Sequence, residues 1–303
     1  MAPGDPREVT TGECTDLYYV DTGMYDTDEY GAVYILDAEQ VAIVDTGIGT
    51  NYERILDALD ALDIAPGDVE YLVPTHVHLD HAGGAGYLAE ACPNATVAVH
   101  ERGARHIVDP SRLWEGTKGA VGDQIKWYTE PKPVPEDRVR ELADGDVVRL
   151  GDHSLHATHA PGHAPHQHVF YDPTNDAVFT ADAAGIYVPT FDSVRETTPP
   201  PQFDLEQAID DVEKLRAIDP STLLYPHFGP APTESRLTEY EAQLEAWVAS
   251  VAEMREELED DEAVVAHFVE DTEMGEVWGE EKARGETAMN VRGVLQYLDR
   301  TGN

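Results

Sequence analysis

Thr75-His76-Val77-His78-Leu79-Asp80-His81 directly follows the apolar run 69–73 and holds three histidines and an aspartate within six residues. The apolar run predicts a strand. Because alternate side chains of an extended segment point the same way, His76 and His78 share one side, whereas Asp80 and His81 lie beyond the turn. Imidazole and carboxylate groups are the ligands expected for zinc or a similar transition ion. This loop therefore has the residues to serve two metal ions.

Three more residues of the same chemical kind each follow an apolar run elsewhere in the chain. They are His163 in Pro161-Gly-His, Asp182 in Phe179-Thr-Ala-Asp and His227 in Leu224-Tyr-Pro-His. If these runs are strands, each residue lies at the carboxyl end of a strand, where the loops of an α/β domain converge. A lone His-x-His pair would carry little information in a chain with 13 histidines. The complete set is more specific, and it predicts that all of these residues meet at one metal-binding centre.

The segments around these residues predict a layered α/β domain. Apolar runs at 32–36 and 41–44 predict a hairpin, and apolar residues at helical spacing predict a helix over 52–62 that Thr50 or Asn51 caps. Further strands are expected over 69–73, 96–99, 153–158, 168–171, 177–180 and 222–225, and further helices over 85–91 and 205–218.

The last quarter of the chain has little strand signal. Apolar residues from Leu237 to Leu258 recur at alternating spacings of three and four, which predicts one long helix. We expect this helix to pack on its own domain, because about three heptads are too few to favour a coiled coil of two chains. A second helix is expected over 283–298, and the acidic run 256–262 is interpreted as a solvated face. These patterns predict a catalytic domain at 1–230 and a helical extension at 231–303.

Taken together, the motifs resemble those of the metallo-β-lactamase fold hydrolases, in particular the glyoxalase II-like branch, over the stretch from Gly31 to about Gly229. The resemblance implies an αββα sandwich with a dinuclear site on its edge. It implies the following ligands: His76, His78 and His163 for the first ion, Asp80, His81 and His227 for the second ion, and Asp182 as the bridge. Asp45 in Val44-Asp-Thr-Gly47 matches an early aspartate of the family that supports the ligands, although an aspartate before glycine also orders turns.

The cofactors that the resemblance implies are two zinc ions, with manganese or iron as alternatives. A bound metal lowers the pKa of water from 15.7 to about 7, and two ions about 3.5 to 4 Å apart hold a bridging hydroxide beside a polarised carbonyl or phosphoryl oxygen. Asp80 is then the expected catalytic residue, which orients or shuttles the proton.

Departures from the family's branches narrow the expected reaction. True β-lactamases lack an acid that bridges two metals where Asp182 lies. Quorum-lactone hydrolases carry a tyrosine three residues after the bridging acid, where this chain has Gly185, although Tyr187 lies nearby. A thiol with a pKa of about 8.5 departs without a general acid, so thioesters make the fewest demands on the site. We therefore expect hydrolysis of a small ester, thioester or lactone. A phosphodiesterase or nuclease of the same fold and a mononuclear-iron enzyme like the persulfide dioxygenases remain open.

Contacts to substrate are expected outside the ligand set. His166 and Tyr187 are candidate acids, whereas His153, His156 and His159 are treated as structural. Eight of the 20 cations fall in one insert, at Arg102, Arg105, Arg112, Lys118, Lys126, Lys132, Arg138 and Arg140. This insert has the charge to hold an anionic substrate, with Arg102 and Arg105 as the first candidates. The alternative is that these cations pair with the surrounding carboxylates.

Charge is the unusual feature of the composition. The chain has 60 Asp and Glu residues against 20 Lys and Arg, which gives a net charge of −40. Such self-repulsion favours a protein adapted to concentrated salt, as in haloarchaeal cytosol, and it opposes nucleic acid as a partner. Two cysteines and the absence of a long apolar run indicate a cytoplasmic protein without a membrane span. We expect a small-molecule substrate as its partner and allow for a homodimer.

Overall fold

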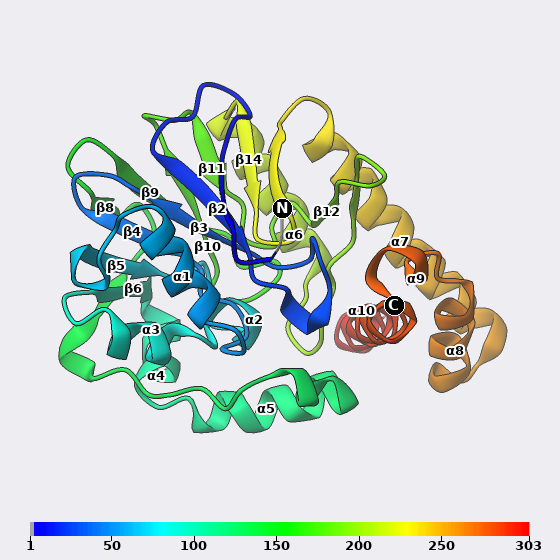
Figure 1. Ribbon diagram of the computed structural model, residues 1–303. Helices are drawn as coiled ribbons and strands as arrows, with labels where there is room; N and C mark the ends of the chain where they lie inside the picture. Colours follow the sequence, from blue (N-terminus) through cyan, green and yellow to red (C-terminus); the bar gives the residue numbers. More distant parts are fainter. Residues whose placement is uncertain (1–2, 303) are drawn as a thin grey trace.

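Two β-sheets packed face to face, with helices on both outer sides, make up the centre of the computed structural model, which describes residues 3–302 (Figure 1). This is the αββα sandwich that the family resemblance implies. The short helices and loops at the edge of the sandwich carry the residues of the candidate site.

The first sheet has seven strands in the order β1-β2-β3-β4-β5-β6-β7, antiparallel from β1 to β4 and parallel from β4 to β7. Its strands are β1 (Pro6–Glu8), β2 (Leu17–Asp21), β3 (Ala32–Leu36), β4 (Val41–Val44), β5 (Val69–Val73), β6 (Thr96–His100) and β7 (Val139–Leu142). The expected hairpin is the pair β3 and β4, in which all nine residues are buried because one face meets the second sheet and the other meets helices.

The second sheet has six strands in the order β15-β14-β11-β10-β9-β8, with β11 and β14 parallel and the other pairs antiparallel. Its strands are β8 (Val147–Arg149), β9 (Ser154–His159), β10 (His168–Asp172), β11 (Ala177–Phe179), β14 (Thr222–Tyr225) and β15 (Gly229–Pro232). A separate two-stranded ribbon consists of β12 (Ile186–Val188) and β13 (Ser193–Arg195).

The two sheets share a core of apolar side chains that point inward from both. Tyr34 and Val44 of the first sheet meet Phe170, Phe179 and Leu224 of the second, and each of these side chains is at most 2% exposed. The hydroxyl of Tyr34 donates a hydrogen bond to the carbonyl oxygen of Tyr225, so this buried polar group is satisfied. The core fixes the relative position of the strand ends that carry the candidate ligands.

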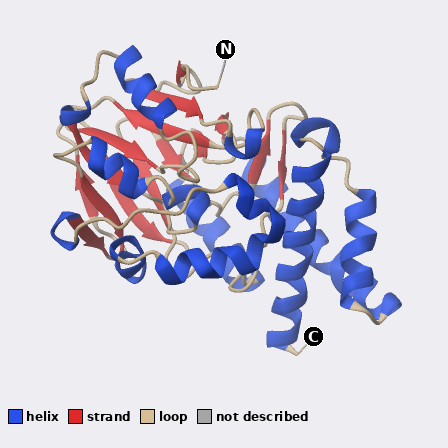
Figure 2. Ribbon diagram, turned by 60° about the horizontal axis from the view of Figure 1, so that its bottom comes forward, coloured by secondary structure: helices blue, strands red, loops and turns tan. Residues whose placement is uncertain are grey.

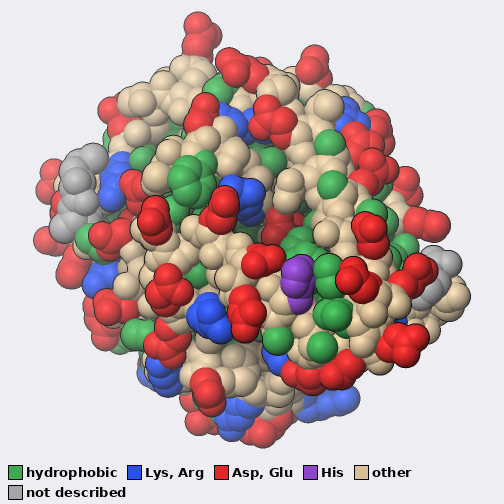
Figure 3. All heavy atoms as spheres, turned by 90° about the vertical axis from the view of Figure 1, so that its right-hand side faces the viewer, with side chains coloured by type: hydrophobic (Ala, Val, Ile, Leu, Met, Phe, Trp, Pro, Cys, Tyr) green, Lys and Arg blue, Asp and Glu red, His purple; other side chains and the backbone are tan. Residues whose placement is uncertain are grey.

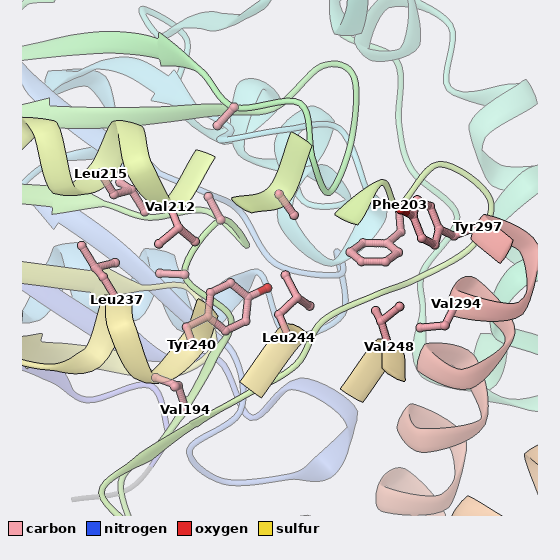
Figure 4. Packing of buried hydrophobic residues seen from close by; sticks show 14 of the residues in the cluster. Val194, Phe203, Val212, Leu215, Leu237, Tyr240, Leu244, Val248, Val294 and Tyr297 are labelled. Atoms are coloured by element: carbon pink, nitrogen blue, oxygen red, sulfur yellow. The ribbon is translucent and has the colours of Figure 1, made fainter. Parts of the chain in front are cut away.

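Helices cover the outer face of each sheet. Three of them pack on the first sheet: α1 (Glu53–Ala61), α3 (Ala85–Ala91) and α4 (Glu101–Val108). Two pack on the second sheet: α6 (Leu205–Ile218) and α7 (Arg236–Leu258). As the sequence predicts, the apolar stripe of α7 packs on its own chain. Figure 4 shows Tyr240, Leu244 and Val248 of α7 in the same cluster as Val212 of α6 and Val294 of the last helix.

The remaining helices complete the fold, some of them at the edge of the sandwich that carries the candidate site. They are α2 (Leu79–Ala82), α5 (Ser111–Val121), α8 (Asp261–Asp271), α9 (Gly275–Trp278) and α10 (Glu280–Thr301), with the 3-10 turns η1 (Met24–Asp26), η2 (Pro66–Asp68), η3 (Gly122–Trp127) and η4 (Glu136–Arg138). α5 contacts α2, α4 and α10, and it runs along this edge in Figures 1 and 2. Among the described residues, no helix is both long and apolar enough to cross a membrane.

One local prediction needs correction, and another is confirmed. Tyr52 is the N-cap of α1, and its helix start has no side-chain cap, so the expected capping by Thr50 or Asn51 is wrong. The hydroxyl of Thr50 instead donates to the carbonyl oxygen of Trp127, because the insert packs against this loop. The acidic run 256–262 is solvent-exposed as expected, with Asp261 partly exposed, and it also holds a helix junction. α7 ends within it and α8 begins, at Glu259 in the left-handed conformation and Asp260 as the new N-cap.

Candidate metal centre

The seven predicted ligands converge at one end of the strands. His76 and His78 lie in the loop after β5, and Asp80 and His81 occupy the short helix α2. His163 follows β9, while Asp182 follows β11 and His227 follows β14. The structure groups these side chains into three overlapping sets of donors that lie within 4.8 Å of one another: His76, His78 and His163; His76, His81 and Asp182; and Asp80, His81 and His227.

The first set has three ring nitrogens that face one another. His76 Nε2 lies 3.0 Å from His78 Nδ1, and the same His78 Nδ1 lies 3.0 Å from His163 Nε2. A single proton on His78 can serve only one of these two contacts. Three lone pairs directed at one point fit a cation between them, since a zinc–nitrogen distance of about 2.0 Å would place such ligands about this far apart.

The set of Asp80, His81 and His227 is more open. Asp80 Oδ2 lies 3.7 Å from His81 Nε2 and 3.7 Å from His227 Nε2, which is too far for hydrogen bonds. Asp182 stands between this set and the set of His76, His78 and His163, with Oδ2 at 3.1 Å from His163 Nε2 and Oδ1 at 3.6 Å from His81 Nε2. His81 Nε2 and Asp182 Oδ1 are buried and have no hydrogen-bond partner among the described residues. Buried polar atoms normally have a partner, so these orphaned atoms fit a second cation.

Two imidazoles are oriented from behind. Asp45 Oδ2 lies 3.0 Å from His81 Nδ1, and Asp45 Oδ1 accepts hydrogen bonds from the backbone N–H and the hydroxyl of Thr75. His227 Nδ1 donates to the carbonyl oxygen of Tyr30 at 2.9 Å. These contacts leave Nε2 of both histidines free to face the centre, as is usual for metal-binding histidines. Asp45 also has a φ of 62°, so it both shapes its turn and supports a candidate ligand.

The pKa shifts at the centre differ between three of its histidines and Asp182. Burial, together with the neighbouring imidazoles, lowers the pKa of His78 to about 3 and also lowers the pKa values of His76 and His163. These three rings are neutral, which is the form that binds metal. Burial alone would raise the pKa of Asp182, but the facing His163 and His81 hold it below its ordinary value. Its carboxylate is therefore ionised.

A cavity of about 670 Å³ opens above the ligands. Its walls are largely aromatic and apolar, and they come from segments that are far apart in the sequence: Tyr25, Tyr30, Tyr128, Ile186, Pro199 and Met289. Tyr25 and Tyr128 share a hydrogen bond of 2.5 Å between their hydroxyls. Sequence reasoning missed this lining, because no motif links the N-terminal loop, the insert and the last helix.

The last helix adds a buried charge pair to the cavity wall. Lys282 Nζ lies 2.6 Å from Glu286 Oε2, and both side chains are 5% exposed. The ammonium group also lies 4.0 Å from the ring centre of Tyr25 and 4.2 Å from that of Tyr30. The hydroxyl of Tyr30 donates to Glu286. The last helix, α10, thus contributes directly to the cavity that the predicted ligands face.

The residues that were expected to contact substrate lie in different parts of the structure. Arg102, Arg105 and His166 line a groove beside the centre, where the ring of His166 stacks on His76 at 6.1 Å and Nδ1 accepts from the backbone N–H of Val77. Tyr187 is not brought to the centre. Its hydroxyl donates to Asp192 at 2.9 Å.

The three histidines expected to be structural also lie outside the ligand sets. His153 lies 2.8 Å from buried Asp172, His156 is exposed, and His159 contacts the carbonyl oxygen of Pro165.

Known proteins resemble this chain in both sequence and fold. A metallo-beta-lactamase fold-containing protein, ST1585 of Sulfurisphaera tokodaii, is 27% identical over 222 residues, which are 71% of this chain and 79% of that protein. The solved structure of the archaeal protein ST1585 has a TM-score of 0.72 and 23% identity, and the match covers 93% of this chain and 99% of that one. A B3 metallo-beta-lactamase with an active-site glutamic acid has the same fold, with a TM-score of 0.58 and 22% identity over 84% of this chain and 92% of that one.

A human protein with a stated activity is also similar. The acyl-coenzyme A thioesterase MBLAC2 of Homo sapiens is 24% identical over 189 residues, and the match spans 55% of this chain and 62% of that enzyme's length. The family model of the metallo-beta-lactamase superfamily matches residues 26–227, which include all seven converging residues. The chain therefore belongs to the metallo-β-lactamase superfamily.

Proposed function

We propose that the protein is a dinuclear zinc hydrolase of small acyl thioesters, as in the glyoxalase II-like branch. The observation that carries this proposal is the convergence of seven imidazole and carboxylate side chains at the floor of an aromatic cavity. His76, His78 and His163 would hold the first ion, Asp80, His81 and His227 the second, and Asp182 both. When bound, such ions supply water of lowered pKa and polarise a carbonyl oxygen.

Asp80 has the position of the residue that handles the proton. Its side chain is 25% exposed and lines the cavity, whereas Asp182 is 3% exposed. Burial would raise the pKa of Asp80, but the facing His81 and His227 keep its carboxylate ionised. An ionised oxygen at the cavity floor accepts a hydrogen bond from the attacking water and orients it toward an acyl carbon.

Asp45 and Tyr30 lie behind the proposed ligands and orient two of them. The carboxylate of Asp45 holds His81, and the backbone carbonyl of Tyr30 holds His227, each through Nδ1. Both imidazoles are thereby oriented so that Nε2 faces the centre. The positioning is built into strand ends, which favours a precise arrangement of the donors.

The states of the two candidate acids favour a thioester over substrates with poorer leaving groups. A thiol with a pKa of about 8.5 departs as thiolate, whereas an alkoxide or amine needs a proton donor. Tyr187, one candidate acid, has its hydroxyl engaged with Asp192 and does not line the cavity. Burial lowers the pKa of His166, the other candidate, to about 2, so it is neutral at ordinary pH. The similarity to acyl-coenzyme A thioesterases supports the same choice.

Metal analysis and a substrate panel test this proposal. Protein loaded with zinc and passed through a desalting column should hold two equivalents and should hydrolyse acyl thioesters faster than acyl lactones or bis(p-nitrophenyl) phosphate. One equivalent of iron with sulfur-oxidising activity would favour the mononuclear alternative. Faster cleavage of the phosphodiester would replace the thioesterase proposal by the phosphodiesterase one.

A further inference from the structure

A wide groove continues from the cavity along the insert. Its volume is about 1390 Å³, and it shares His78, Thr117, Ala120 and Pro200 with the cavity above the ligands. The shared residues make the two hollows direct neighbours, and His78, a member of the set His76, His78 and His163, lies on their common border. A molecule that fills the cavity with one end can therefore lie in the groove with the other.

Three arginines line this groove. Arg102 and Arg105 are exposed on α4, and Arg112 is exposed at the start of α5. Glu101 is the acidic residue that also lines it, so three guanidinium charges face one carboxylate. In a chain with 60 acidic and 20 basic residues, a groove with excess positive charge is a strong local departure from the average.

These arginines differ from the lysines of the same insert in their partners. Lys118 pairs with Glu115, Lys126 with Glu281 and Lys132 with Glu90. Within residues 3–302, by contrast, no carboxylate lies within ion-pair distance of Arg102, Arg105 or Arg112. The expectation that the cations of the insert merely neutralise nearby acids thus describes the lysines and not the arginines of the groove.

The groove arginines keep most of their donors available. Arg102 Nη1 makes a long contact of 3.4 Å to the carbonyl oxygen of Pro165, and Arg105 Nε donates to His106 Nε2 at 3.1 Å. Burial, with Arg105 and Arg112 nearby, lowers the pKa of His106, which is therefore neutral and adds no charge of its own. Within residues 3–302 these guanidinium groups make no further hydrogen bonds, which leaves N–H donors for an oxyanion.

We propose that this groove binds the phosphate groups of a nucleotide thiol that carries an acyl group, such as acyl-coenzyme A. The thioester of this substrate then lies at His78, and its acyl group enters the aromatic cavity. The inference rests on the proposed thioesterase function and names its substrate class. Guanidinium and phosphate form bidentate, charge-assisted hydrogen bonds that act at short range. In molar salt the Debye length falls to about 3 Å, so such contacts persist while the repulsion from the net charge of the chain is screened.

Binding and hydrolysis together test the groove. The probes are coenzyme A and pantetheine, which share the thiol arm but differ in the phosphorylated nucleotide, titrated calorimetrically into the zinc-loaded protein in molar potassium chloride. The test variant is the triple change Arg102→Gln, Arg105→Gln, Arg112→Gln. The matched control is Arg149→Gln, an exposed arginine on β8 that does not line the groove. Circular dichroism and zinc content should be the same in all three proteins.

We expect coenzyme A to bind at least about tenfold more tightly than pantetheine, and the triple variant to lose this difference while Arg149→Gln keeps it. In the triple variant, the ratio of kcat/KM for acyl-coenzyme A to that for the truncated thioester S-acyl-N-acetylcysteamine should fall by the same factor. Equal binding of the two probes by the unmodified protein, or an equal loss in the control, would overturn the inference. Tighter binding of a single-stranded oligonucleotide than of coenzyme A would do the same.

The outcomes separate the two proposals. Binding of coenzyme A that depends on the groove arginines, without hydrolysis of any thioester, would retain the phosphate site and remove the thioesterase function. Hydrolysis of both thioesters with no preference for the phosphorylated one would retain the function and remove the phosphate site.

Discussion

Asp45 Oδ2 lies 3.0 Å from His81 Nδ1, and the opposite ring nitrogen of His81 lies 3.6 Å from Asp182. One carboxylate thus orients an imidazole whose other side faces a second carboxylate. This relationship joins the turn after β4 to the helix α2 and to the end of β11, so the geometry of the proposed metal centre depends on contacts between segments up to about 140 residues apart.

Asp45→Asn tests this positioning. Asparagine tolerates the left-handed backbone that Asp45 adopts, so the turn should survive. The loss of the charged partner of His81 should weaken metal binding by about 10- to 100-fold, because such supporting groups fix the ring and raise its basicity. Competition with a zinc chelator measures the change. Unaltered zinc affinity in the variant would show that Asp45 serves only the turn.

Asp182→Ala should release at least one zinc ion and abolish hydrolysis, because its carboxylate stands between the two donor sets. The fold should persist, since the residue follows β11 rather than lying within it. His156→Ala is the matched control, because His156 is exposed and its ring contacts Ser154. Elemental analysis and activity should change only in the first variant. An equal loss in both would mean that the centre is assigned to the wrong residues.

Much of this arrangement is predictable from short-range patterns. The helices over 85–91 and 205–218 have the expected bounds, because apolar spacing decides them locally. The candidate ligands can be picked out in the sequence because each follows an apolar run that forms a strand. The cavity wall is not predictable in this way, because Tyr25, Tyr128 and Lys282 meet only through tertiary packing. The helices of the insert were also missed, as their Gly and Pro residues obscure the helical pattern.

A cluster of buried histidines predicts sensitivity to acid. Burial lowers the pKa of His168 to about 3 and that of His100 to about 4. Both ring nitrogens of His168 are without a hydrogen-bond partner among the described residues. The unfolded chain, with a pKa near 6.5, binds a proton at pH 5 that folded His168 does not. Stability is therefore present above about pH 6.5 and falls as the pH is lowered toward the folded pKa.

His168→Phe isolates this effect, because phenylalanine keeps the ring that packs on Phe170 and cannot be protonated. Between pH 7 and pH 5 the free energy of unfolding of the unmodified protein should fall by about 2 kcal/mol more than that of the variant. Urea titrations at the two pH values measure the difference. The same comparison cancels protonation of the metal-site histidines, which both proteins share. Parallel pH curves would contradict the prediction.

The buried pair on α10 predicts a penalty for removing one charge. Lys282→Met leaves Glu286 buried without its cation and should destabilise the protein by about 3 kcal/mol, since an uncompensated buried charge is costly. Lys282→Met with Glu286→Gln should recover part of that loss, because Tyr30 and Asn290 can still hydrogen-bond an amide. Thermal melting of both variants makes the comparison. A double variant less stable than the single one would show that the pair is not coupled in this way.

Finally, the surface predicts dependence on salt. Acidic side chains are spread across the face that carries the C-terminal helices, with few cations among them (Figure 3). Because the net charge is −40, folding brings like charges together and the folded state is destabilised by their repulsion. Salt screens this repulsion, since the Debye length falls from about 10 Å at 0.1 M salt to about 3 Å at 1 M. The melting temperature should rise across that range in potassium chloride. The triple glutamine variant of the groove has lost three positive charges that offset the acidic surface. Its melting temperature should therefore rise slightly more steeply with salt concentration. A flat melting curve would reject the proposal that the chain is adapted to concentrated salt, because repulsion on this scale has to respond to screening if it limits stability.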